Sequence, residues 1–361
     1  MGFIWLTSSL HGILILFVKK KDGSLRLCVD FHGLNCISKK DCYLLLLISN
    51  LLDSPRKAWV YSKIDLHHTY YLVRIANSDE YDIFSNLLDV CVVIYLDNIL
   101  IYSNNMSKYH QYVKEVLKHL HKASLYAKVE KCKFHSKSVE YLEYILFPSG
   151  LTMSNEKLKI IQDWPEPKKV KDIQSFLGFA NFYHQFIFNY LDIVIPLTHL
   201  IQKDIFWKFD SSCQDAFNSL KKAFTSAPIL TYWIPDTQLI VETDASDYTL
   251  TTILFILNED NKVHPVAFHS HTFTAAELNY NTYNKELLAI FEAFKIWQYY
   301  LEGPAYLINV VIDHKNLEYF STTKVLIWRQ VQWSEYLSQF NLVIRFYSGH
   351  LGTKLDALTR R

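Results

Sequence analysis

The spacing of apolar residues switches along this chain between the period of a β-strand and the period of an α-helix. From Val90 to Ile101 apolar residues stand on both sides of the polar pair Asp97-Asn98 in a strand pattern, and from Lys108 to Leu125 they recur every three or four positions. The last third repeats the switch, with a strand pattern at Gln238–Thr243 and a helical stripe at Asn284–Leu301. Strands mixed with helices pack as layers. The pattern therefore predicts an α/β or α+β fold.

A hairpin is expected near the start, because the turn signal Asp22-Gly23 separates strand patterns at Ile13–Lys19 and Leu25–Phe31. The other expected elements are strands at Ala58–Leu66, Val263–Phe268, Tyr306–Ile312 and Phe340–Phe346, and helices at Asn155–Trp164, Val170–Leu191 and Cys213–Ser226.

The chain is too long for one hydrophobic core. It has 361 residues, whereas domains usually hold about 100–200 residues. Half of the residues are hydrophobic and 20% are charged, a composition that excludes disorder and supports packed cores. Helices cannot continue through Pro165-Glu166-Pro167, and Pro228 and Pro235 bracket a connector. The first group of prolines separates two helical segments, and the sequence predicts several subdomains with a boundary near residues 227–237.

Composition also restricts where the chain works. Its longest apolar runs, Gly12–Val18 and Tyr43–Ile48, are far shorter than the roughly 20 residues that cross a bilayer, and the start lacks a signal peptide. The six cysteines form no C-x-x-C pair, which favours a reducing, intracellular compartment. The net charge is only +1, but basic residues cluster at Lys19–Lys21 and Lys128–Lys137. Such runs are either solvated surface or nucleic-acid contacts.

Four acidic residues lie at the ends of expected elements in the last third. Asp244 and Asp313 end strands, Glu286 falls in the first turn of a helix, and Asp356 lies in a short C-terminal helix. Acids that converge in this way can hold two divalent cations about 4 Å apart for phosphodiester cleavage. Each acid alone also has a structural interpretation, because a carboxylate at a helix N-terminus complements the helix dipole and aspartate is common in turns.

The strings around these acids resemble, in order, the four motifs of the RNase H domain of gypsy-type LTR retrotransposons. They are Thr243-Asp244-Ala245-Ser246, Lys285-Glu286-Leu287-Leu288, Asp313-His314-Lys315-Asn316-Leu317 and Leu355-Asp356-Ala357-Leu358. The resemblance implies that Asp244 bridges two Mg²⁺ or Mn²⁺ ions. It implies that Asp356 completes one metal site, and that Glu286 with Asp313 completes the other.

Upstream strings resemble the reverse transcriptase of the same family, in family order. The fingers hairpin is similar to Val18–Arg26, the two palm motifs to Ser62–Leu66 and Tyr95–Ser103, and the thumb to Ser175–Gly178 with Asn181-Phe182-Tyr183. The resemblance implies that Lys20 and Arg26 meet the incoming triphosphate, and that Asp65 and Asp97 hold the polymerase metals. The aromatic thumb string has plain core packing as an alternative.

The palm departs from the family pattern in two ways. Asn98 stands where the family has a second aspartate, and an amide in place of an anionic ligand weakens cation binding. The interval between Asp65 and Asp97 is also about half of the family's, with an internal deletion placed between about 84 and 90. The resemblance therefore implies an inactive polymerase beside an intact nuclease.

Other departures share one chemical direction. An expected arginine, proline, glycine or aspartate is replaced by a residue that one cytosine-to-thymine change produces. These positions are His32, Cys42, Leu44, Leu46, Asn98, Glu143, Ser348 and His350. We hypothesise a copy degraded by cytosine deamination, and alignment of its coding DNA with intact relatives tests this.

The sequence thus predicts a multidomain α/β and α+β chain of truncated reverse transcriptase fingers, palm and thumb followed by an RNase H-like mixed-sheet domain. The expected boundaries are 1–153 for fingers and palm, 154–235 for thumb and connection, and 236–361 for the RNase H-like domain. The expected function is that of an RNA-directed DNA polymerase and RNA–DNA hybrid ribonuclease with the polymerase inactive. The alternatives are a non-catalytic nucleic-acid-binding remnant and a translated remnant without function.

The resemblance also implies partners and a location. The partners are an RNA–DNA hybrid, an RNA template with a DNA primer, and the protease and integrase domains of a polyprotein, with no membrane. The location is the cytoplasm, in a virus-like particle, or the nucleus. A separate RNase H enzyme fits less well, because the upstream motifs stand in family order.

Overall fold

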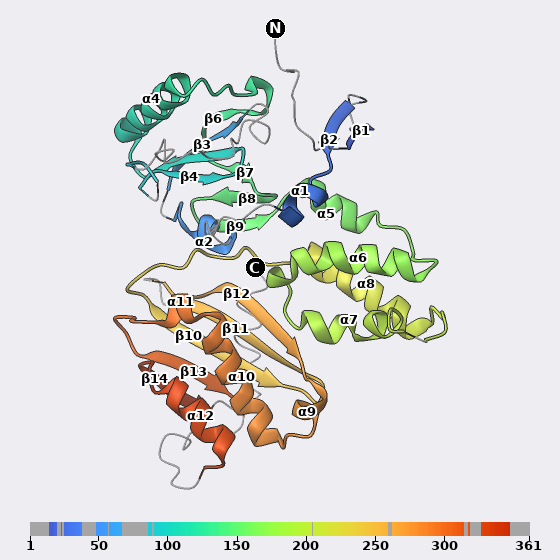
Figure 1. The fold of residues 1–361 in the computed structure, drawn as a ribbon. Coiled ribbons are helices and arrows are strands. Elements are labelled where there is room, and N and C mark those ends of the chain that lie inside the picture. Colours follow the sequence, from blue (N-terminus) through green and yellow to red (C-terminus); the bar gives the residue numbers. More distant parts are fainter. Residues whose placement is uncertain are drawn as a thin grey trace. The chain divides into compact units, whose positions relative to one another are not determined.

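The computed structural model describes residues 14–19, 23, 25–37, 48–56, 58–66, 86–88, 90–203, 205–258, 262–313, 317 and 326–346. The chain divides into two compact units, Met1–Leu47 and Ile48–Arg361. Figure 1 labels the helices and strands of both units. No helix in the described ranges is long and apolar enough to cross a membrane.

The first unit contains the hairpin that the Asp-Gly turn predicts. Strands β1 (Ile15–Lys19) and β2 (Leu25–Val29) pair antiparallel, and α1 (His32–Ile37) follows. Gly23 adopts a φ of 80° between the strands, a conformation that favours glycine. Lys20 and the side chain of Arg26 lie outside the described residues, so their contact with a triphosphate stays a prediction.

The second unit begins with α2 (Ile48–Asp53) and a four-stranded antiparallel sheet in the order β4–β5–β3–β6. The strands are β3 (Val60–Asp65), β4 (Val92–Tyr95), β5 (Asn98–Ser103) and β6 (Lys133–Ser136). Helix α4 (Met106–Lys122) starts at the cap residue Asn105, whose side chain accepts hydrogen bonds from the Ser107 and Lys108 amides. Val116 and Leu120 of this helix share a core with the sheet.

A three-stranded sheet and a group of helices follow. The 3₁₀ helix η1 (Val129–Lys131) precedes β6, and the sheet consists of β7 (Val139–Tyr141), β8 (Tyr144–Phe147) and β9 (Gly150–Met153). The helices are α5 (Asn155–Gln162), α6 (Val170–Phe182), η2 (His184–Phe186), α7 (Tyr190–His199) and α8 (Ser211–Thr225).

The single helix expected at Val170–Leu191 was wrong, because α6 ends at Phe182. Asn189 then adopts a left-handed φ of 53° before α7 begins, a conformation that asparagine tolerates better than most residues. The aromatic residues of the thumb string pack in a core: Phe176 and Tyr183 are nearly fully buried. The core interpretation of this string therefore holds alongside the family resemblance.

The last part is a five-stranded mixed sheet in the order β12–β11–β10–β13–β14. Its strands are β10 (Gln238–Ala245), β11 (Thr249–Leu257), β12 (Val263–Thr272), β13 (Ile308–Ile312) and β14 (Leu342–Phe346). The first three pair antiparallel, whereas β13 runs parallel to β10 and β14 parallel to β13. Strand β11 was missed from the sequence, although it lies beside β10.

Helices cover this mixed sheet. They are α9 (Ala275–Leu278), α10 (Thr282–Ile296), α11 (Gln298–Leu301) and α12 (Trp328–Leu337), and Figure 1 shows α10 and α12 over the same face. Leu288 and Phe294 of α10 share a core with Val310 of β13. Phe291 is only half-buried and its ring faces Trp333 and Tyr336 of α12. Phe291 therefore packs between the two helices rather than between helix and sheet.

Candidate nuclease and polymerase sites

Parallel pairing of β10 with β13 positions two of the predicted acids. Ile240 lies opposite Asn309, and Glu242 lies opposite Val311. Extending this register by two residues sets Asp244 opposite Asp313, and side chains two residues apart on a strand share a face. Asp244 is the next-to-last residue of β10, and Asp313 directly follows β13. Both acids therefore stand at the same edge of the sheet.

Helix α10 positions the third acid. Its cap residue Asn281 accepts a hydrogen bond from the Asn284 amide at 3.0 Å. The first turn of α10 contains no acidic residue, so the expectation that Glu286 occupies that turn was wrong. Glu286 is 3% exposed, and α10 packs on β10 and β11. A role in neutralising the helix dipole is therefore excluded for Glu286, because it lies beyond the first turn.

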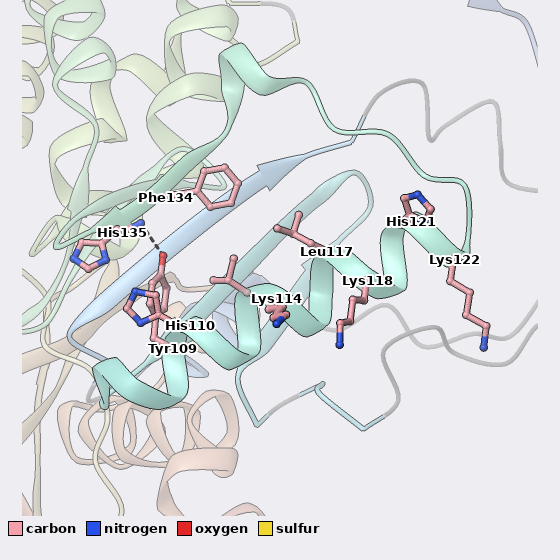
Figure 2. Close-up of a pocket in the computed structure, with 10 residues that line it drawn as sticks. Tyr109, His110, Lys114, Leu117, Lys118, His121, Lys122, Phe134 and His135 are labelled. Atoms are coloured by element: carbon pink, nitrogen blue, oxygen red, sulfur yellow. Dashed lines mark hydrogen bonds between the residues drawn. The ribbon is translucent and has the colours of Figure 1, made fainter.

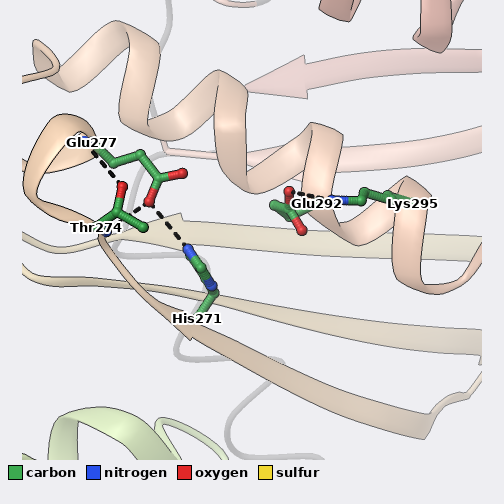
Figure 3. Close-up of polar contacts among 5 residues, drawn as sticks. All are labelled: His271, Thr274, Glu277, Glu292 and Lys295. Atoms are coloured by element: carbon green, nitrogen blue, oxygen red, sulfur yellow. Dashed lines mark hydrogen bonds and ion pairs between the residues drawn. The ribbon is translucent and has the colours of Figure 1, made fainter.

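A capping box fixes the segment that leads into α10. The Glu277 carboxylate accepts hydrogen bonds from the Thr274 amide at 2.7 Å and from His271 at 3.2 Å, and the Thr274 hydroxyl accepts from the Glu277 amide. Figure 3 shows these contacts, and beside them the ion pair of Glu292 with Lys295 on α10. Reciprocal caps of this kind satisfy amides that a helix start leaves free. The loop before the Glu286 helix is thus held in one conformation.

The three acids act on one another electrostatically. The pKa of Glu286 is raised to about 8, mainly by burial and in part by the charges of Asp244 and Asp313. Desolvation raises the pKa of Asp244, and the charge of Asp313 adds to this. The Oε2 atom of Glu286 is buried and has no hydrogen-bond partner among the described residues. A hydrogen bond from the Ala245 backbone acts in the opposite direction and lowers the pKa of Glu286. A buried carboxylate oxygen without a partner is costly, and a bound cation is one way to compensate it.

The predicted metal site is incomplete in the part of the chain that the structure describes. No three His, Cys, Asp or Glu side chains in these ranges lie close enough together to hold a metal ion. Asp356, His314 and His350 lie outside the described residues. The oxygen donors and the unpartnered Oε2 of Glu286 do suit a hard cation such as Mg²⁺. The four-carboxylate cluster therefore stays a prediction, with three of its members coupled through their charges.

Asp192 of α7 is a further acid beside Asp244 that sequence reasoning missed. Its charge raises the pKa of Asp244, and its carboxylate accepts a hydrogen bond from the Thr249 hydroxyl. No local motif marked this residue, because it belongs to a helix some fifty residues upstream in the chain. The contact links the helical region to the first hairpin of the mixed sheet.

The palm motifs bring Asp65 and Asp97 to one end of the four-stranded sheet. Asp65 ends β3 opposite Asn98, and Asp97 lies in the turn between β4 and β5. The Leu66 amide donates to the Asp97 carbonyl at 2.8 Å, which fixes the turn against β3. The two predicted metal ligands are thus neighbours, as their motifs imply.

Neither palm acid offers a free carboxylate, which sequence reasoning missed. Lys128 Nζ lies 3.1 Å from one Asp65 oxygen, and Lys131 Nζ lies 3.8 Å from the other. The Asp65 side chain is only 10% exposed. The Asn98 amide donates to the Asp97 carboxylate at 3.0 Å. Side chains of the protein itself therefore contact both Asp65 oxygens and one Asp97 oxygen, where a metal ion would compete with them.

Comparisons with known proteins agree with these motifs. The family described as reverse transcriptase (RNA-dependent DNA polymerase) matches residues 78–146, and the RNase H-like domain found in reverse transcriptase matches residues 209–309. The transposon Tf2-7 and Tf2-3 polyproteins of Schizosaccharomyces pombe are each 30% identical over 393 residues, 99% of this chain. The chain spans 30% of the length of these relatives. The aligned stretch is longer than the chain's 361 residues, so the relative carries residues there that this chain lacks.

Solved structures show the same fold. A foamy viral protease-reverse transcriptase in complex with dsDNA matches with a TM-score of 0.80 and 21% identity, over 95% of this chain and 79% of that chain. The same kind of protein in complex with an RNA/DNA hybrid matches with a TM-score of 0.77 and 20% identity, over 95% of this chain and 51% of that chain. The two family matches and the 30% identity to the transposon polyproteins over 99% of the chain place it in the reverse transcriptase and RNase H region of gypsy-type LTR-retrotransposon polyproteins.

Proposed function

We propose that this chain cleaves the RNA strand of an RNA–DNA hybrid with Mg²⁺ or Mn²⁺, and that it does not extend DNA primers. One observation carries the first half of the proposal. Glu286 is buried, its Oε2 atom has no partner among the described residues, and the charges of Asp244 and Asp313 act on it. Nothing in protein packing requires such a group, whereas a divalent cation would stabilise it.

The residues that would hold the metal ions are Asp244, Glu286, Asp313 and Asp356. Bound ions would supply an activated water and would neutralise charge on the leaving oxygen. The chain itself contributes a rigid frame: a parallel strand pair holds Asp244 and Asp313, and the capped helix α10 holds Glu286. We expect selection of a hybrid through its shape and its 2′-hydroxyl groups, because RNA-containing duplexes are recognised in that way.

The second half of the proposal concerns the palm. Lys128 and Lys131 lie at the Asp65 carboxylate. Asn98 replaces the second acid of an intact palm, and its amide donates a hydrogen bond to the Asp97 carboxylate. Fewer anionic oxygens leave less charge for two divalent ions. The relative also carries residues within the aligned stretch that this chain lacks. These observations support loss of polymerisation.

Hybrid cleavage by the full-length chain tests the nuclease. A hybrid labelled on its RNA strand is incubated with and without Mg²⁺, beside single-stranded RNA of the same sequence. We expect cuts only in the hybrid and only with the metal. Asp244→Asn should abolish them, whereas Asp247→Asn, which changes an exposed acid three residues away, should not. If the Asp244→Asn variant cut the hybrid as fast as the wild type, the activity would come from a contaminant.

The non-catalytic alternative makes a different prediction for the same sample. A chain that only binds nucleic acid would retain the hybrid in EDTA, with an affinity that falls as salt rises, and would cut nothing when Mg²⁺ is added. We further propose that the chain acts within a polyprotein that carries a protease and an integrase, in a cytoplasmic virus-like particle or in the nucleus. The matched transposon proteins are polyproteins by name, which supports this setting.

A further inference from the structure

A hollow of about 700 Å³ is lined by residues of α4 and β6, and neither Asp65 nor Asp97 belongs to its lining. We call it the α4 groove. Its main lining side chains are Lys114, Leu117, Lys118, His121, Lys122 and Phe134, with His110 and His135 at one end. Figure 2 shows His110 and His135 at one end of the groove, His121 and Lys122 at the other, and Phe134 and Leu117 between these ends. No acidic residue in the described part of the chain belongs to the lining.

The three lysines form a row along the helix. Lys114, Lys118 and Lys122 are four residues apart, so each is displaced from the previous one by about 6 Å along the helix axis and lies on nearly the same side. The row is therefore about 12 Å long. A line of positive charges with this spacing is complementary to an extended anionic chain rather than to a single small anion.

Two large apolar side chains are exposed in the same place. Phe134 is 48% exposed and Leu117 is 43% exposed. An aromatic ring beside lysines is the arrangement by which proteins bind single-stranded nucleic acid, since bases stack on the ring while phosphates meet the cations. An acidic peptide would use the lysines but would gain less from a flat ring. The combination therefore favours a nucleic acid over a protein partner.

The walls of the groove are fixed before any ligand binds. The buried Tyr109 hydroxyl accepts a hydrogen bond from the His135 amide at 2.8 Å, which ties β6 to α4. His110 bonds to the Met106 carbonyl at 2.9 Å, and its ring lies 5.4 Å from that of Tyr109. A preorganised surface loses less entropy on binding than a flexible one.

We propose that the α4 groove binds single-stranded nucleic acid through its backbone phosphates, with Phe134 as a stacking platform. This site lies on the four-stranded sheet, whereas the proposed nuclease acids belong to the five-stranded sheet. Binding there needs no metal ion and no hydrolysis. The inference therefore goes beyond hybrid cleavage and stands independently of it.

Fluorescence anisotropy of a labelled twelve-nucleotide oligouridylate tests the proposal, with the full-length chain in EDTA over a range of KCl concentrations. The groove variant is Lys114→Glu/Lys118→Glu/Lys122→Glu. Its control, Lys108→Glu/Lys159→Glu/Lys222→Glu, changes the net charge equally at three exposed lysines outside the groove. We expect at least tenfold weaker binding by the groove variant, and a plot of log K against log salt that is shallower by about 2. An equal loss of affinity in both triple variants would mean that net charge alone causes the effect, and it would overturn the proposed site.

A second pair of variants tests the stacking platform. Phe134→Ala should weaken binding at least fivefold without changing the salt dependence, whereas Phe206→Ala, which removes a ring that is 92% exposed elsewhere, should have no effect. Ultraviolet crosslinking of the wild-type chain should attach uridine within residues 109–135. Crosslinks confined to other segments, or an acidic peptide that displaces the oligonucleotide at equal charge concentration, would overturn the proposal even if the triple variant failed to fold.

Discussion

Two buried carboxylates in this chain share a family role and differ in their neighbours. Asp65 in the palm is engaged by Lys128 and Lys131. Glu286 in the mixed sheet has a buried oxygen without a partner among the described residues, beside two further acids. Ammonium groups neutralise the first site permanently, whereas the second has a charge that only a proton or a cation can neutralise. We infer that retention of an acid in the sequence does not by itself retain the surroundings that a metal site needs.

The largest expected effect separates the two sites by activity. Glu286→Gln should lower hybrid cleavage more than about 100-fold, because loss of groups that only orient a metal ligand already costs roughly 10–100-fold. Asp65→Asn should leave cleavage unchanged. Both rates are measured on the full-length chain at saturating Mg²⁺. Similar losses in the two variants would show that the two sites are not independent.

The placement of Glu286 depends on how firmly α10 is held. Phe294 is fully buried in the core between α10 and the sheet, so Phe294→Ala should lower the free energy of unfolding by about 3–5 kcal/mol. Phe291 is half-buried against α12, and Phe291→Ala should cost clearly less. Urea denaturation of both variants measures this. The reverse order would mean that the helix face is assigned wrongly.

Asp53 offers a third buried carboxylate, engaged by a hydroxyl instead of an ammonium. It accepts a hydrogen bond from Tyr300, and burial raises its pKa to about 6. Because the folded chain binds this proton more tightly than the unfolded chain, protonated Asp53 adds to the free energy of unfolding at acid pH. This contribution is lost as the pH rises through the pKa of the folded state. The loss amounts to about 3 kcal/mol between about pH 4 and pH 7.

Asp53→Asn should therefore flatten the pH dependence of stability over that interval. Chemical denaturation of the wild type and the variant at several pH values measures it. Asp53→Asn should also destabilise the chain less at neutral pH than at acid pH. An unchanged pH profile in the variant would assign the dependence to other groups.

Because lysines contact Asp65, we expect its replacement to change the free energy of unfolding, but by less than the preceding changes. Asp65→Asn should lower the free energy of unfolding by about 1–3 kcal/mol, since it leaves partly buried ammonium groups without their counter-ion. Lys128 is 24% exposed, so water compensates part of the loss. High salt should reduce the difference between wild type and variant. An increase in stability would indicate that desolvation of the ion pair costs more free energy than the attraction between its charges contributes.

Strand β11 illustrates which parts of the fold could not be predicted from periodicity. The hairpin β1–β2 and the helices α4, α5 and α8 could, because a turn signal or a stripe of apolar residues marks each of them. Thr249–Leu257 is buried along nearly its whole length, so its side chains do not alternate between core and solvent. A short buried run cannot be distinguished from a helical segment by periodicity alone. Its position beside β10 is a property of the assembled sheet.

The same limit applies to the sites. Motif order located Asp244, Asp313 and Glu286, since local strings carry the resemblance. The Lys128 contact lies 63 residues from Asp65 in sequence, and only the pairing around β3 and β6 brings the two together. The basic run at Lys128–Lys137 was the one available signal, and it was consistent with solvated surface. Long-range ion pairs of this kind need the fold before they can be recognised.

The smallest expected effect is the absence of rescue in the palm. Asn98→Asp restores the anionic group that the family motif has at this position, and it also replaces the amide that donates to Asp97. We still expect no primer extension on an RNA template, because Lys128 and Lys131 continue to engage Asp65. Adding Lys128→Gln removes the closer lysine, and the double variant should remain inactive as well, because the interval between Asp65 and Asp97 stays short. Measurable extension by Asn98→Asp alone would show that metal ions can displace the lysines from Asp65. The Asn98 amide alone would then account for the difference between the two carboxylate sites.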